Sequence, residues 1–354
     1  MKLPLMLCVM VSLAALVQCT SQPAFDEDEW LEQVAMTDSA MLYASHVRDN
    51  GTFFNPWLER SRQRGRRSWF WSRLFNKKDQ YDSFSRAEYS AVANDYAYLS
   101  DNDFDSISFA GHASMIIKMD NETIFTDPFF SNAALVVMKK VKIKFDFSRV
   151  PQKPVVLISH NHYDHLDKYS VKQLIQKDAV FIVPLGLKPF FIKMGAKEVH
   201  ELDWWESTSV GAITYTLLPA QHWSRRIGQS PGTTLWGSFM IEGSRTVYFS
   251  GDTGYFKGFA EFGGRFDVDY AVLGVGAYEP RWFMHYCHMN VAEFFRAADD
   301  LGAKKVIPMH FGVISLSDEP LLHPLYAVNQ FIKLYPEYLG RIHPLRTGEF
   351  LKME

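Results

Sequence analysis

The segment VVLISHNHYDHLD, residues 155–167, carries the strongest structural signal in this chain. An apolar run that predicts a buried strand ends at Ser159 and leads directly into four potential metal ligands: His160, His162, Asp164 and His165. Crowded titratable groups that become buried need a compensating charge, and a divalent cation supplies it. Imidazole and carboxylate ligands suit zinc, although ligand type by itself also allows iron or manganese.

Three further predicted strands are each followed by a potential metal ligand. Ligand groups in α/β proteins collect at the carboxyl ends of strands, where loops emerge from a rigid sheet. We therefore expect these segments to meet the first one at a single site in an α/β fold. The three strands and their ligands are residues 213–220 with His222, residues 246–250 with Asp252, and residues 306–309 with His310.

The spacing of these ligands favours two metal ions. A loop of the form H-x-H-x-D-H cannot direct all its side chains at one tetrahedral ion without folding back on itself. Two ions solve this geometry, and a carboxylate with two oxygens can bridge them. The expected first site consists of His160, His162 and His222, the second consists of Asp164, His165 and His310, and Asp252 is the bridging residue.

The composition is that of a globular protein with a large core. Of the 354 residues, 47% are hydrophobic and 22% are charged, which does not favour disorder. The formal net charge of -3 argues against wholesale nucleic-acid binding. We therefore expect no nucleic-acid partner.

The chain divides into three expected parts. Residues 1–19 carry one lysine and an apolar run that is short for a membrane span, which predicts a cleaved signal peptide and export to a secreted, periplasmic or envelope location. An uncleaved anchor, or a lipoprotein modified at Cys19, stays open. We expect residues 20–104 to form an N-terminal arm packed on the body. Residues 105–354 contain no Pro/Gly/Ser linker and are expected to form one domain.

The arm contains a segment unlike the rest of the chain, residues 60–78, which we call the basic–aromatic segment. Its cations are interleaved with aromatic residues, among them Trp69, Phe70 and Trp71. This combination is typical of an interfacial anchor, in which the rings enter the lipid headgroup region and the cations meet anionic lipid. A peripheral membrane surface is therefore an expected partner, with a solvated basic linker as the alternative. The cations are Arg60, Arg62, Arg64, Arg66, Arg67, Arg73, Lys77 and Lys78.

The order H-x-H-x-D-H followed by a later His, Asp and His resembles the dinuclear hydrolases of the metallo-β-lactamase superfamily. This resemblance implies an αββα sandwich for residues 105–354, with the ligand roles given above. Two subgroups are disfavoured. Asp252 stands where true β-lactamases usually place a cysteine, and His162 stands where oxygen-reducing diiron members usually place a glutamate.

A narrower resemblance covers most of residues 51–353 and is to the N-acyl-phosphatidylethanolamine-hydrolysing phospholipases D. It implies that a metal-bound hydroxide attacks the phosphodiester and releases phosphatidic acid and an N-acylethanolamine. It also implies a homodimer, a catalytic and substrate-binding His288, and a substrate-contacting Tyr163. The matching motifs are FFNPW (53–57), GHA (111–113), TDPFF (126–130), SHNHYDHLD (159–167), PAQHW (219–223), GDTGY (251–255) and GAYEPRWFM (276–284).

Several alternatives stay open. His112 and Asp127 are expected to support the ligands by hydrogen bonds rather than to bind metal. His288 could be structural, and the Tyr163 ring could simply wall the pocket. The same metal site could serve a lactonase or a nuclease, and a structural zinc-binding envelope protein is a further alternative. A structural site usually has four ligands and is closed, which disfavours the last.

Overall fold

The computed structural model describes residues 25–58, 81, 83–100, 104–131, 141 and 143–354 of the chain. The predicted signal peptide, residues 1–19, and the basic–aromatic segment lie outside these residues. Within the described part of the chain, no helix combines the length and the apolar composition that crossing a membrane requires.

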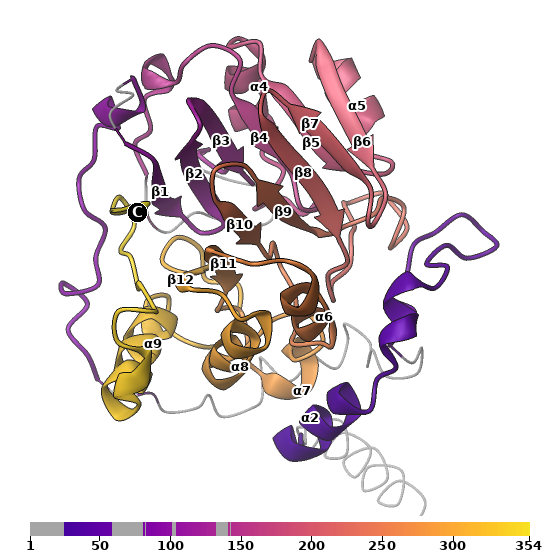
Figure 1. Cartoon of the computed structure of the whole chain (residues 1–354), viewed down its shortest axis with the longest axis vertical. Coiled ribbons are helices and arrows are strands. Elements are labelled where there is room, and N and C mark those ends of the chain that lie inside the picture. Colours follow the sequence, from indigo (N-terminus) through magenta and orange to yellow (C-terminus); the bar gives the residue numbers. More distant parts are fainter. Residues whose placement is uncertain (1–24, 59–80, 82, 101–103, 132–140, 142) are drawn as a thin grey trace, which may run out of the picture.

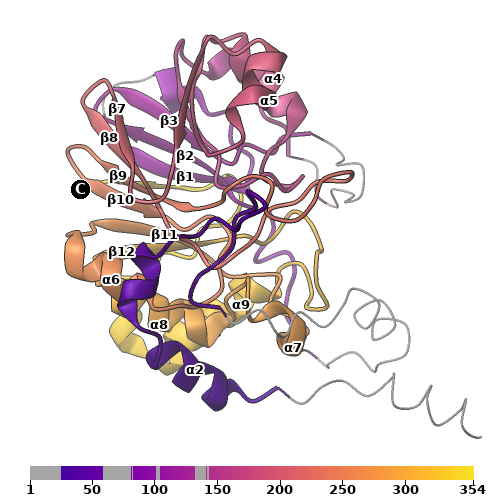
Figure 2. The same ribbon diagram turned by 90° about the vertical axis from the view of Figure 1, so that its right-hand side faces the viewer.

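The described strands form two sheets that pack face to face (Figures 1 and 2). The first sheet has the order β13 (Phe350–Lys352), β1 (Ser106–Gly111), β2 (Ser114–Met119), β3 (Glu122–Thr126), β4 (Val155–Leu157), β5 (Val180–Pro184) and β6 (Glu198–Leu202). The second has the order β12 (Lys305–Met309), β11 (Tyr270–Gly274), β10 (Thr246–Phe249), β9 (Ser238–Glu242), β8 (Ile213–Leu218) and β7 (Ser207–Val210).

Helices cover both outer faces of this pair of sheets, as Figure 2 shows. Helices α4 (Lys168–Ile175) and α5 (Lys188–Met194) lie on the side of the first sheet. Helices α6 (Gly258–Arg265), α8 (Val291–Leu301) and α9 (His323–Leu334) lie on the side of the second. The layers follow the order α, β, β, α, which confirms the predicted αββα sandwich. The short elements are α7 (Arg281–Met284), η2 (Ala97–Ser100), η3 (Phe147–Arg149) and η4 (Pro336–Tyr338).

The core follows from the alternation of side chains along the strands. Ile117 and Ile124 belong to the large apolar cluster that includes residues of the second sheet such as Tyr215. Their neighbours Ile116 and Phe125 point the other way, into the cluster that includes residues of α4 and α5. Because both faces of the first sheet are covered, its strands β4 and β5 are apolar throughout.

Two helices show how local sequence sets their ends. Helix α8 spans Val291–Leu301, because Asn290 forms a capping box with Glu293 and Gly302 ends the helix at a φ of 65°. Helix α4 begins at Lys168. The reason is that the Asp167 side chain accepts hydrogen bonds from the first free backbone N–H groups.

The described N-terminal residues pack on the body. Helix α2 (Glu27–Ala35) lies beside α7 and α8, where Trp30 Nε1 donates to Glu293 Oε1 at 3.0 Å. The 3-10 helix η1 (Ser39–Tyr43) follows, and Trp205 Nε1 donates to the Leu42 carbonyl at 2.9 Å. These contacts agree with an arm that packs on the body, while the exact domain boundaries stay a prediction.

Candidate metal centre

The strand directions bring the predicted ligands together. In the first sheet β1, β3 and β4 run the same way, because β1–β2 and β2–β3 are antiparallel pairs and β3–β4 is parallel. In the second sheet β8, β10 and β12 also run the same way, because β8–β9 and β9–β10 are antiparallel pairs and β10–β11 and β11–β12 are parallel pairs. The loops that follow these strands meet at one site. They carry His112, Asp127, residues 160–165, His222, Asp252 and His310.

The first cluster contains His160, His162, His222 and Asp252, whose ligand atoms lie within 4.8 Å of one another. His160 Nε2 lies 2.8 Å from His162 Nδ1, and His222 Nε2 lies 3.2 Å from the same His162 nitrogen. Three ring nitrogens therefore converge on one point, as they do around a metal ion.

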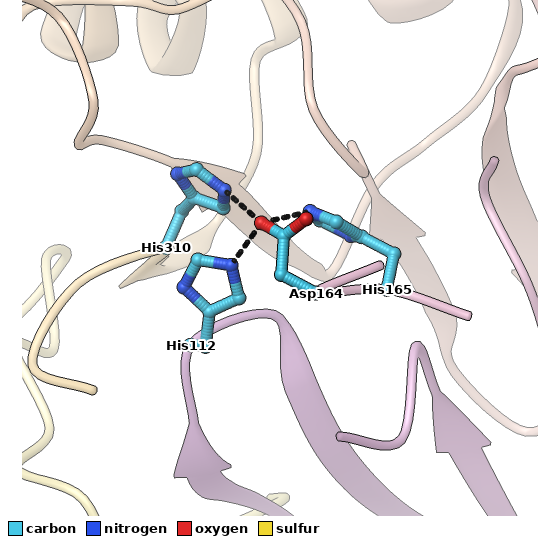
Figure 3. Close-up of side chains that lie close together, drawn as sticks. All are labelled: His112, Asp164, His165 and His310. Carbon is cyan, nitrogen blue, oxygen red and sulfur yellow. Dashed lines mark hydrogen bonds and ion pairs between the residues drawn. The ribbon is translucent and has the colours of Figure 1, made fainter. Parts of the chain in front are cut away.

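The second cluster contains His112, Asp164, His165 and His310 (Figure 3). Asp164 Oδ2 lies 2.8 Å from His112 Nε2, 3.5 Å from His165 Nε2 and 4.0 Å from His310 Nε2. His112 and His310 have φ values of 59° and 74°, a backbone conformation that is costly for residues with a Cβ and concentrates at functional sites.

Asp252 lies between the two clusters. Its Oδ2 is 3.1 Å from His165 Nε2 and 3.7 Å from His222 Nε2, and its Oδ1 is 3.0 Å from His310 Nε2. The carboxylate thus contacts histidines of both clusters, as a bridging ligand does. Gly251 makes the approach possible: its φ is 55°, and a Cβ there would lie 2.6 Å from Ser159 Cβ.

Burial keeps several of the histidines neutral, which is the form that binds metal. Burial, followed by the charges of neighbouring histidines, lowers the pKa of His160 well below its ordinary value. Burial also lowers the pKa of His222 well below that value and the pKa of His162 to about 4.

The ionised carboxylates of the site favour positive charge beside them. Burial opposes ionisation of Asp252, yet His165 and His310 hold its pKa well below the ordinary value. Burial also opposes a charge on His165, but Asp252 and Asp164 raise its pKa well above the ordinary value.

The donor atoms fit metal ions. His310 Nε2 and Asp252 Oδ1 lie 3.0 Å apart, yet neither makes a hydrogen bond within the described residues, and both are buried. His165 Nε2 is in the same situation. Buried polar atoms are expensive to leave without hydrogen bonds, so imidazole nitrogens and carboxylate oxygens that converge in this way fit a shared cation. The chemistry of the set, imidazole nitrogens and carboxylate oxygens, suits zinc-like divalent ions.

Asp127 supports both clusters from behind. Its Oδ2 accepts from His165 Nδ1 at 2.7 Å and from Ser159 Oγ at 2.5 Å, and its Oδ1 accepts from Ser159 N at 2.7 Å. Ser159 Oγ in turn lies 2.9 Å from His160 Nδ1. One buried carboxylate therefore orients a histidine of each cluster, which agrees with its predicted supporting role.

The predicted substrate residues lie at the rim of the centre. The His288 ring, partly exposed, is stacked at 5.1 Å on His310 and lies 5.3 Å from His222. Burial lowers the pKa of His288 to about 3. Tyr163 lies between His162 and Asp164 in the loop and is partly exposed, and the Arg226 guanidinium covers its ring at 4.4 Å.

Some contributors were missed or underestimated from the sequence. His112 contacts Asp164 and also belongs to the group of side chains that could bind a metal ion. It is an isolated histidine in the sequence, so its spacing from the other ligands gave little indication of a metal-binding role. Asn55 Nδ2 donates to the His222 carbonyl at 3.0 Å, and Trp57 Nε1 donates to Gln221 Oε1 at 3.0 Å. Asn55 and Trp57 both belong to the FFNPW motif, which is one of the motifs shared with the phospholipases and could therefore have indicated a role near the site.

Comparisons with known proteins agree with this site. Residues 122–311 match the beta-lactamase superfamily domain and make up more than half of the chain. The chain therefore belongs to the beta-lactamase superfamily and is a metal-dependent hydrolase with the metallo-β-lactamase fold. A possible metal-dependent hydrolase from Veillonella parvula has the same fold, with a TM-score of 0.58 at 17% identity over 71% of this chain and 100% of that one.

Two relatives are more similar in sequence. An uncharacterized protein of Mycobacterium tuberculosis is 33% identical over 249 residues, which cover 66% of either chain. The Saccharomyces cerevisiae protein named N-acyl-phosphatidylethanolamine-hydrolyzing phospholipase D, mitochondrial, is 34% identical over 215 residues. That match covers 57% of this chain and 46% of the yeast protein, so less than half of the yeast protein is compared. The predicted resemblance to these phospholipases is confirmed.

Proposed function

We propose that this chain is a zinc-dependent phosphodiesterase of the phospholipase D type, which hydrolyses N-acyl-phosphatidylethanolamine to an N-acylethanolamine and phosphatidic acid. One observation carries the proposal. The motifs that the chain shares with these phospholipases are far apart in sequence, yet Asn55, His112, Asp127 and His222 from four of them meet around one centre. The name of the yeast relative supplies the substrate.

The residues of the centre fit two zinc ions. His160, His162 and His222 would hold one ion, Asp164, His165 and His310 would hold the other, and Asp252 would contact both. Bound zinc supplies Lewis acidity and lowers the pKa of a coordinated water to about 7, which gives a nucleophile near neutral pH without a nucleophilic side chain.

The remaining residues would bind and orient the substrate. His288 lies beside both clusters and is partly exposed, so a neutral imidazole N–H can donate to a phosphate oxygen there. The Tyr163 ring stands at the same rim and would contact the substrate outside the metal ligands. The buried carboxylate of Asp127 would hold the imidazoles in place during turnover.

A product assay tests the substrate. Purified protein is offered N-acyl-phosphatidylethanolamine, phosphatidylcholine, an acyl-homoserine lactone and RNA, and the products are identified by mass. We expect N-acylethanolamine and phosphatidic acid from the first at the highest rate. Faster hydrolysis of lactone or RNA would contradict the lipid assignment and leave the fold and the metal centre untouched.

We propose that the protein is exported through residues 1–19 and docks on membranes through the basic–aromatic segment, acting as a homodimer. Each Lys or Arg near an anionic surface contributes on the order of 1 kcal/mol, so binding should weaken as salt rises. Liposome sedimentation compares the parent with a variant in which Trp69, Phe70 and Trp71 are changed to Ser. Equal, salt-insensitive binding of both to anionic vesicles would rule out this docking surface.

A further inference from the structure

Arg226 joins a second loop to the segment that carries most of the ligands. We call residues 160–166 the metal loop. Arg226 lies in the connection between β8 and β9, and its guanidinium donates to backbone carbonyls of the metal loop. Its Nε donates to Asn161 O at 2.6 Å, and its Nη2 donates to Leu166 O and, at 3.5 Å, to His162 O.

These carbonyls stand at the two ends of the metal loop. Asn161 lies between the two histidines of the first cluster, and Leu166 directly follows His165 of the second. A single planar, rigid group therefore spans the segment whose two halves belong to different clusters. Guanidinium presents its N–H groups in a fixed fork, so it sets the distance between acceptors more strictly than a flexible ammonium can.

The side chain is itself held in place. Its guanidinium covers the Tyr163 ring at 4.4 Å and lies 5.7 Å from the centre of the Phe190 ring. Its own loop is closed by a hydrogen bond from Gly232 N to Ser224 O at 2.9 Å. A second link runs from Asn161 Nδ2 to Gln229 Oε1 at 3.2 Å. The fork thus connects two segments with restricted positions.

We propose that Arg226 is a positioning residue that fixes the spacing between the two halves of the metal loop, and with it the geometry of both metal clusters, while holding the Tyr163 ring at the rim. The role is indirect, through backbone carbonyls and one ring. It rests on the proposed metal centre and is independent of the identity of the lipid substrate.

The test measures zinc binding without substrate. Zinc is titrated into metal-free parent and Arg226→Ala protein against a chromophoric chelator, and apo-protein unfolding is followed in parallel. Loss of outer partners of metal ligands typically lowers metal affinity about 10–100-fold, and we expect at least about a tenfold loss here. Added guanidinium should restore much of the affinity of Arg226→Ala, because it can occupy the same three acceptors.

Two variants sharpen the result. Arg226→Lys keeps the charge but cannot span the acceptors, so its zinc affinity should also fall, and it serves as the test if Arg226→Ala does not fold. Arg225→Lys is the matched control, because Arg225 Nε donates to Gln229 O in its own loop. Its zinc affinity should equal that of the parent.

The outcomes separate the two ideas. Parent-like zinc affinity in both Arg226 variants would refute the positioning role while leaving the proposed function intact. A parent protein that binds no zinc would refute the proposed function and this inference together. Weakened affinity with rescue by guanidinium supports the positioning role, since a general folding defect would not respond to that small molecule.

Discussion

Replacing Asp127 by Asn removes one charge from behind the metal centre and changes almost no volume. The carboxylate is fully buried and accepts three hydrogen bonds, from Ser159 N, Ser159 Oγ and His165 Nδ1. An amide has one oxygen and one NH2 group. Whichever way the amide of the Asp127→Asn variant is turned, at least one of the three donors therefore faces its NH2 group instead of an acceptor.

The size of the effect follows from that mismatch. A buried donor left without an acceptor costs about 1–3 kcal/mol, and hydrogen bonds to charged groups contribute about 1.5–3 kcal/mol. If this energy appears as poorer orientation of His165 and His160, zinc affinity should fall by roughly 10–100-fold, the loss typical for outer partners of metal ligands. We therefore expect weaker zinc binding in a protein that still folds.

Competition with a chelator measures the zinc affinity, and thermal unfolding of the metal-free protein checks the fold. Asp146→Asn is the control, because Asp146 is exposed and caps η3 by accepting from Ser148 N at 2.9 Å. The control should bind zinc like the parent. Parental zinc affinity in folded Asp127→Asn would refute the reasoning, because the carboxylate would then not orient the ligands.

Three further predictions concern metal content, catalysis and acid stability. The purified protein should bind about two zinc ions per chain by metal analysis. One ion in fully active protein, or an Asp252→Ala variant with parental turnover, would contradict the dinuclear centre. His288→Ala should lower turnover with both ions still bound, and loss of zinc or of the fold would favour a structural role. His285 is 5% exposed, and burial lowers its pKa to about 4. The unfolded chain therefore takes up this proton near pH 6.5 and the folded chain only near pH 4. As the pH falls from about 6.5 to about 4, the free energy of unfolding of the parent should therefore decrease by up to about 3 kcal/mol more than that of His285→Phe. Denaturant unfolding at several pH values measures both, and an equal decrease in the two proteins would argue against this.

The ligand set could be predicted from the sequence because its signal is local. His160, His162, Asp164 and His165 lie within six consecutive residues after a buried strand, and so many titratable groups are costly to bury there without a cation. The ends of helix α8 are also set by local sequence, because its apolar spacing, its capping box and its terminal glycine all lie within or beside its own residues. The structure places all the predicted ligands together, while their metal-binding role stays a prediction.

The partners of the supporting residues could not be found in this way. Arg226 is 60 or more residues from the carbonyls to which it donates, and Asn55 is 167 residues from His222. A lone arginine or asparagine in a sequence gives no indication of a distant backbone partner. His112 was expected to support the ligands, but only the structure identifies its partner, Asp164, at 2.8 Å.

The sequence by itself therefore determined the chemistry of this protein: which side chains can bind a divalent cation, and that they follow buried strands. Only the tertiary structure decided their arrangement. The order of strands in two sheets, and the packing of the sheets face to face, bring loops from β1, β4, β8, β10 and β12 to one place. The physical reason is that ligand type is a property of single residues. Proximity across the fold depends on strand pairing and core packing, which local patterns do not encode.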